Sequence, residues 1–159
     1  MLDENFFVLT FSEILSMIVT IASVGLIVKQ LNESRLASQM EGFLELGAQF
    51  GEIAPAIEFI DALTLSSEWN SMSAEESYRH IFDNEVNRNF FKKVGVFYEI
   101  LGALLQRGVL DNKLAMDTFG AIGSNRWQTV KKVAKIQRSL MKEQSLYEHW
   151  EWFAKKFDN

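Results

Sequence analysis

The sequence predicts an all-α protein, with a single N-terminal transmembrane helix followed by a cytoplasmic helical bundle. Three observations support this prediction. Residues 6–28 form a nearly uninterrupted apolar run, later apolar residues recur at helical spacings of three and four, and the 159 residues include one proline. The alternation typical of β-strands is missing from the sequence. We therefore divide the chain into a transmembrane segment, residues 1–30, and an all-helical domain, residues 31–159.

The apolar run at 6–28 contains 23 residues and a single charge, Glu13. A helix needs about 20 mainly apolar residues to cross the hydrocarbon core of a bilayer. Acidic residues precede the run, whereas Lys29 and Arg35 follow it. Because basic residues flank the cytoplasmic end of a membrane helix, this order predicts that the helical domain lies in the cytoplasm.

Two other interpretations of this run are open. A secretory signal peptide begins with basic residues, whereas this chain begins with MLDEN, so the sequence favours cleavage less. A core helix is the second interpretation, because Glu13 leaves only 15 uncharged residues, from Ile14 to Val28. The protein would then be a soluble helical dimer with a buried N-terminal helix.

Polar residues gather on one face of the predicted span. Four small hydroxyl residues follow one another there at spacings of four, four and three, beside a glutamate. In lipid, such residues let helices approach closely and form hydrogen bonds, and a carboxylate in the membrane favours a partner helix or a wet lumen. We therefore predict a homo-oligomer, with a pore as an extension, formed through Ser12, Glu13, Ser16, Thr20 and Ser23.

Apolar spacing and capping signals divide the remaining chain into helices. The N-terminal helix should continue to about residue 50, and Pro55 should open a short helix. Ser73 and Glu76 match the capping-box pattern of a helix start, whereas the preceding LSSEWNSM is polar and predicts a loop. Asp111 should cap one helix, and Ser124 or Asn125 the last. The predicted helices cover residues 55–64, 73–84, 84–107, 111–120 and 126–156.

The predicted helix 84–107 is apolar over so much of its surface that it should lie at the centre of the bundle. It contains Gly95 and Gly102, which each cost about 1 kcal/mol relative to alanine in a helix, so close packing of a neighbouring helix is the expected reason for them. Glu99 lies between them on the same side. If that side is buried, the carboxylate needs a partner, and we predict a structural pair with Arg138.

The net charge of −5 hides an uneven distribution of charge. Residues 41–85 carry ten acids and one base, whereas residues 126–142 carry six bases and no acid. Two interpretations of the basic stretch are open: a solvated or acid-matched surface within the domain, or a site for an anion, a partner or RNA. The candidate binding residues are Arg126, Lys131, Lys135, Arg138 and Lys142.

The sequence predicts neither catalysis nor a cofactor. It has no cysteine, no glycine-rich phosphate loop and no nucleophile motif. Its two histidines, His80 and His149, do not form the paired Glu-x-x-His motifs of a di-iron bundle. We therefore name no catalytic residue and no metal ligand.

The order of landmarks resembles a bacterial family known as domain of unknown function 4760. The shared features are the segments GFLELGAQF and NEVNRNFFKKVGVFYEILGALLQRGVLD, Trp127 at the start of a helix, and a closing cluster of Tyr147, Trp150 and Phe153. In outline the chain is also similar to the membrane accessory proteins of type VI-B CRISPR systems. This resemblance implies a bacterial inner-membrane oligomer that serves antiviral defence.

The resemblance also reaches helical nucleases, which carry an arginine four to six residues before a histidine. Here Arg79 and His80 are adjacent, so the chain departs from that pattern. We expect a non-enzymatic membrane protein whose helical domain binds lipid, a second copy or another protein. A membrane-tethered RNA-binding or degenerate nuclease-like domain is the alternative. The sequence leaves open the ligand or trigger, the partner, the oligomer size and the formation of a pore.

Overall fold

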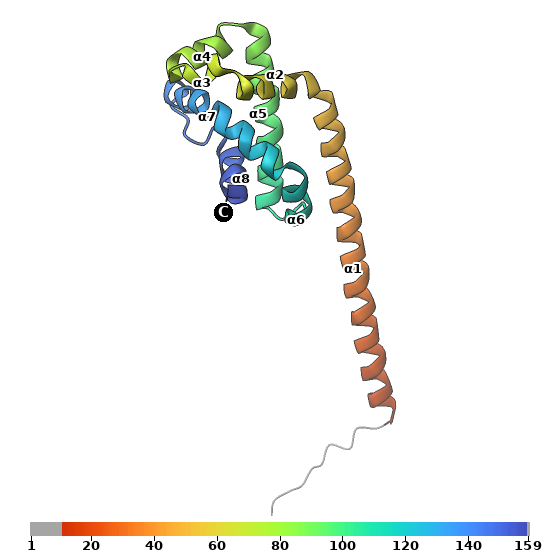
Figure 1. Ribbon diagram of the computed structural model, residues 1–159. Helices are drawn as coiled ribbons and strands as arrows, with labels where there is room; N and C mark the ends of the chain where they lie inside the picture. The colour runs from red at the N-terminus through yellow and green to blue at the C-terminus, as the bar shows by residue number, and fades with distance from the viewer. Residues whose placement is uncertain (1–10, 159) are drawn as a thin grey trace, which may run out of the picture. The chain divides into compact units, whose positions relative to one another are not determined.

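The structure is a computed structural model that describes the backbone of residues 11–158 and the side chains of residues 19–157. This part of the chain is all-helical, as the sequence predicts (Figure 1). The elements are α1 (Phe11–Glu52), α2 (Ala54–Leu65), α3 (Ser67–Ser71), α4 (Ala74–Phe82), α5 (Glu85–Gln106), α6 (Asn112–Ala115), the π-helical turn η1 (Met116–Gly120), α7 (Ala121–Met141) and α8 (Glu148–Asp158).

The chain divides into two compact units. The first ends at Ser38, and the second, which we call the helical unit, starts at Gln39. In the helical unit α5 packs against α2, α4 and α8, and α7 packs against α2, α4 and α8. Figure 1 shows α7 crossing α5, with α8 beside both. The core they enclose is rich in aromatic rings, including Trp69, Phe91, Phe97, Tyr98, Phe119, Trp127, Trp150 and Phe153.

Several predicted helix starts are confirmed by hydrogen bonds. The Ser73 hydroxyl accepts from the Glu76 amide while the Glu76 carboxylate accepts from the Ser73 amide, which completes the capping box. Asn84 caps α5, whose bounds match the predicted central helix, and Asp111 caps α6. Pro55 lies in the first turn of α2, where its missing amide costs nothing.

The C-terminal third differs from the prediction of one helix over 126–156. The helical path that begins at α6 continues through η1 into α7, so neither Ser124 nor Asn125 caps a helix. It ends at Lys142, whose φ of 54° is left-handed, and α8 follows Tyr147, whose φ is 62°. Neither residue is glycine, so the sequence carries no usual sign of this break.

The predicted loop at 65–72 is also wrong in part, because it contains the short helix α3. The Ser66 hydroxyl accepts from the Trp69 amide at the start of α3. Trp69 is 2% exposed, and its indole Nε1 donates to the Thr129 carbonyl of α7. In the sequence, Trp69 stands among serines and an asparagine, so the polar surroundings gave no sign that its side chain is buried.

The predicted membrane span falls largely outside the side chains that the structure describes. Among residues 19–157, no helix is long and apolar enough to cross a bilayer. The prediction covers residues 6–28, so most of it is not tested by this result. That residues 6–28 span a membrane therefore stays a prediction.

Candidate functional site

An ion pair between a buried arginine and a half-exposed aspartate, with a tyrosine beside it, joins three helices of the helical unit. Arg126 of α7 is 4% exposed, and its Nε and Nη2 donate to the two carboxylate oxygens of Asp61 on α2, each at 2.7 Å. Its Nη1 donates to the Tyr98 hydroxyl of α5 at 2.8 Å. The guanidinium carbon also lies 5.7 Å from the Phe50 ring centroid. Because all three guanidinium nitrogens are engaged, this cluster favours a structural role for Arg126 over binding of an external anion.

Electrostatics hold this cluster in its charged form. Burial raises the pKa of Tyr98, although the adjacent Arg126 opposes that rise. Burial alone would lower the pKa of Arg126, but its bonds to Asp61 and Tyr98 outweigh burial and raise it. Tyr98 therefore stays a neutral hydroxyl beside a permanent guanidinium charge. It serves as a hydrogen-bond partner and has no tendency to act as a base.

Glu99 caps the N-terminus of α8. Its carboxylate oxygens accept from the backbone amides of His149 and Trp150 at 3.3 Å and 3.1 Å. The first amides of a helix have no partner within the helix, and a negative charge there also meets the positive end of the helix dipole. Glu99 therefore fixes where the last helix begins.

The two glycines of α5 provide the space for this contact. A Cβ on Gly102 would lie 2.3 Å from the His149 carbonyl oxygen, and one on Gly95 would lie 2.6 Å from the Tyr147 ring. The prediction that close helix packing explains these glycines is confirmed. The ring beside Gly95 belongs to Tyr147. Because the Tyr147 hydroxyl is buried, its pKa is raised to about 12.

Arg138 does not form the predicted pair with Glu99. Its Nη1 donates to the Glu151 carboxylate of α8 at 2.7 Å, and its Nε donates to the Leu146 carbonyl at 2.8 Å. The cause is the break between α7 and α8, which turns α8 back so that Glu151 reaches Arg138. Glu99 receives backbone amides instead of a cation.

Only some residues of the predicted basic face lie at the surface of the helical unit. Arg126 and Arg138 are engaged with carboxylates inside the helical unit, whereas Lys131, Lys135 and Lys142 are exposed. Arg126 meets an acid from the acid-rich segment 41–85, as one of the two interpretations expected. The set of five does not form one anion site.

A sixth base, Lys132, also serves the fold. Its Nζ donates to the carbonyls of Trp69 and Met72 at the end of α3 and lies 4.7 Å from the Trp69 ring centroid. Burial lowers the pKa of Lys132, and the charge of Glu76 opposes that shift. Lys132 therefore ties α3 to α7.

The predicted oligomer face is described only in part. Ser12, Glu13 and Ser16 lie outside the residues whose side chains the structure describes. Thr20 and Ser23 are both exposed, and the Ser23 hydroxyl donates to the Val19 carbonyl of its own helix at 2.8 Å. Large aliphatic side chains surround them, and six are at least half exposed: Val19, Ile21, Val24, Leu26, Ile27 and Val28.

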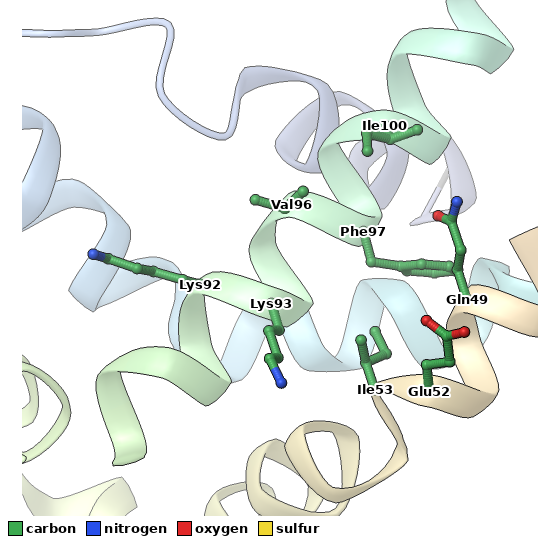
Figure 2. A pocket seen from close by; sticks show the side chains of 8 residues that line it. All are labelled: Gln49, Glu52, Ile53, Lys92, Lys93, Val96, Phe97 and Ile100. Carbon is green, nitrogen blue, oxygen red and sulfur yellow. The ribbon is translucent and has the colours of Figure 1, made fainter. Parts of the chain in front are cut away.

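A groove within the helical unit has no counterpart in the sequence-based predictions. It lies where the end of α1 and the start of α2 approach α5, and its volume is about 430 Å³ (Figure 2). Periodicity alone gives no sign of it, because it depends on how the end of α1 and Ile53 meet one face of α5. Its lining residues are Gln49, Glu52, Ile53, Lys92, Lys93, Val96, Phe97 and Ile100.

Metal ligands do not cluster in the described part of the chain. Among residues 19–157, no group of three or more histidine, aspartate or glutamate side chains is placed to hold a metal ion. His80 and His149 lie in different surroundings: His80 packs its ring against Trp69, and His149 contacts Gln106.

Comparison with known proteins gives one match. The model of a family described as "Domain of unknown function (DUF4760)" matches residues 10–157. No curated protein and no solved structure matches the chain. The match extends over the apolar run of α1 as well as the helical unit, whereas the similarity to CRISPR accessory proteins stays a prediction.

Proposed function

The chain belongs to the DUF4760 family, and we propose that it is a non-enzymatic, single-pass membrane protein of the bacterial inner membrane. Its apolar N-terminal helix anchors it and self-associates. Its helical unit lies in the cytoplasm and binds a protein partner. A role in antiviral defence extends this proposal and is supported by the resemblance of the sequence alone.

The observation that carries the anchoring proposal is the exposure of apolar side chains on α1. Ile21 is 64% exposed and Leu26 is 61% exposed. Leaving such side chains in water forfeits about 1.5–3 kcal/mol each relative to burial. Large contiguous apolar patches mark surfaces that meet a membrane or another protein. Lipid is the occupant we favour, because the run continues toward residue 6 with a single charge.

The partner-binding part of the proposal is supported by how the buried charges are used. Arg126, Glu99 and Arg138 each hold one helix of the helical unit against another. Catalysis would need a charged group that faces a substrate, whereas each of these groups is held by hydrogen bonds inside the helical unit, and the one free nitrogen among them, Arg138 Nη2, is buried. The two arginines of the predicted basic face are engaged within the helical unit and only its three lysines are exposed, so we favour a protein partner over RNA.

Alkaline carbonate extraction of the full-length protein tests the anchor. The wild type should stay in the membrane pellet, whereas the double variant Val19→Glu and Ile21→Glu should wash off, because these positions lie near the middle of the span 6–28, where a charge costs about 2.5–3.5 kcal/mol. Leu65→Glu is the matched control, since Leu65 is 87% exposed in the helical unit. Release of the wild type, with a dimer in solution, would instead support the buried-helix alternative.

Disulfide crosslinking tests self-association, since the chain has no cysteine of its own. Ser23→Cys should crosslink in membranes, whereas Ile21→Cys, two residues away on a helix of 3.6 residues per turn, faces nearly the opposite way and should not. Equal crosslinking at both positions would contradict a defined face. Overexpression that slows growth, and relief of that effect by Glu13→Leu, would support the defence role.

A further inference from the structure

The groove beside α5 has the composition of a small-molecule site. Ile53, Val96, Phe97 and Ile100 supply an apolar lining, and Phe97 is 4% exposed, so its ring closes the inner side. Ligand pockets measure about 300–1,000 Å³ and combine apolar walls with a few polar groups. At about 430 Å³, the groove lies toward the small end of that range. It therefore suits one chain-like ligand better than a two-chain lipid.

Charge is distributed unevenly around the groove. Figure 2 shows Lys92 and Lys93 on one side and Gln49 and Glu52 on the other. In the part of the chain that the structure describes, Lys92 and Lys93 have no hydrogen-bond or ion-pair partner. Two unengaged ammonium groups beside an apolar wall attract a negative charge attached to a hydrocarbon chain.

We propose that this groove binds a long-chain fatty acid as its carboxylate. The carboxylate lies at Lys93, Lys92 adds positive charge on the same side although its side chain points away from Lys93 (Figure 2), and the acyl chain covers Val96 and Ile100. Glu52 sets the direction, because it repels a carboxylate from the opposite side. This inference concerns the helical unit alone and does not depend on whether residues 6–28 enter a membrane.

A partner helix is the competing occupant, and the dimensions disfavour it. The lining residues of α5 run from Lys92 to Ile100, which is about 12 Å at the rise of an α-helix. Helix-in-groove recognition uses anchors at i, i+3, i+4 and i+7, so a docked helix would need this whole length in apolar contact. Here the lysines occupy one end of it.

Photocrosslinking of the purified full-length protein tests the proposal, in nanodiscs if the protein stays with the membrane on carbonate extraction and in aqueous buffer if it does not. The probes are two oleate analogues, one with a diazirine at the terminal carbon and one with a diazirine near the carboxylate, and peptide mass spectrometry locates the adducts. The terminal label should fall near Ile100 and Gln49, and the other near Lys92 and Lys93. Excess unlabelled oleate should compete, whereas oleoyl methyl ester should compete poorly because it lacks the charge.

Matched variants separate charge from space. Lys92→Glu with Lys93→Glu should reduce competed labelling about fivefold or more, whereas Lys131→Glu with Lys135→Glu should leave it unchanged. Ile100→Trp should block the groove and reduce labelling. Ile122→Trp is its control, because Ile122 is 45% exposed, close to the 42% of Ile100, and lines a different surface.

Three results would overturn the proposal. They are adducts confined to residues 19–28, labelling that excess oleate does not reduce, or competition by an acidic amphipathic peptide with none by oleate. The first would indicate the bilayer-facing helix and would leave the anchoring proposal intact. The last would assign the groove to a protein partner. Loss of anchoring together with retained groove labelling would contradict only the proposed function.

Discussion

Helix α5 and residues 19–38 of α1 are both rich in apolar residues, yet they have opposite surroundings. In α5, Val94, Tyr98 and Leu101 are 0% exposed, because other helices of the helical unit cover them. In α1, Val19 is 57% exposed and Leu31 is 64% exposed. Apolar content alone therefore does not determine burial. What differs is how the polar residues of each helix are used.

The polar and small residues of α5 serve packing against specific neighbours. Glu99 caps α8, Gly102 leaves room for the α8 backbone at His149, and Gly95 leaves room for the ring of Tyr147 just before α8. In α1, the Ser23 hydroxyl bonds to its own helix, and a Cβ on Gly25 would have no atom within 4 Å. The first pattern is that of a core helix, whereas the second, at Ser23 and Gly25, is that of a helix surface that can meet lipid or another copy.

Removing the largest buried ring should have the greatest effect. Trp150 stacks on Tyr98 at 4.8 Å between ring centroids, and Trp150→Ala should lower the free energy of unfolding by about 3–5 kcal/mol. Leu31→Ala should change it by less than about 0.5 kcal/mol. Urea denaturation followed by circular dichroism measures both. A large loss from Leu31→Ala would show that α1 is buried by self-association.

Breaking the buried ion pair should come next. Arg126→Gln leaves Asp61 and Tyr98 without their cation, and we expect a loss of about 3 kcal/mol, since breaking buried pairs typically costs 3–5 kcal/mol and Asp61 is half exposed. Lys135→Gln, at an exposed position of the same helix, should have little effect. In a double-mutant cycle with Asp61→Asn, additive losses would show that the pair contributes nothing by itself.

Adding one methyl group should distinguish the two helices by the sign of the effect. Gly102→Ala should destabilise by about 1–3 kcal/mol, because the new Cβ meets backbone that is unable to yield easily. Gly47→Ala in α1 should stabilise by about 1 kcal/mol, because nothing lies within 4 Å and alanine favours helix. Thermal unfolding gives both signs. Stabilisation by Gly102→Ala would contradict the close contact with α8.

The smallest expected effect depends on pH. Bonds from Lys155 and Arg138 lower the pKa of Glu151 below its usual value of 4.5, against the opposing effect of burial. The ionised Glu151 carboxylate thus stabilises the fold at pH values above 4.5. This contribution disappears as the pH falls through the lowered pKa of Glu151. Glu151→Gln should cost about 1–2 kcal/mol at neutral pH. Its difference from the wild type should shrink toward pH 3; a constant difference would exclude the charge as its cause.

The sequence predicted three local features correctly, although other local signals, such as a cap at Ser124 or Asn125, were wrong. The capping box at Ser73, the cap at Asp111 and the apolar spacing of α5 each involve neighbours within one helix, and all three were predicted. The sharp break at Lys142 and Tyr147 was not, because left-handed backbone at non-glycine residues follows from tertiary packing.

The site was less predictable because its contacts join distant segments. Arg126 and Asp61 are 65 residues apart, and no spacing rule links them. The acid-rich and basic segments suggested that charges would match within the domain, but they did not identify the pair. Glu99 was correctly expected to need a partner; the partner was wrong because the turn that positions α8 was missed. The groove forms where the end of α1 meets α5, and apolar periodicity within one helix does not predict it.

Trp150 gives the molecule a built-in spectroscopic reporter. Its indole Nε1 donates to the Gly123 carbonyl at 3.1 Å, and the side chain is fully buried. The indole proton can exchange with deuterium only when α8 leaves α7. A single resolved resonance in a nuclear magnetic resonance spectrum thus records how often the last helix detaches.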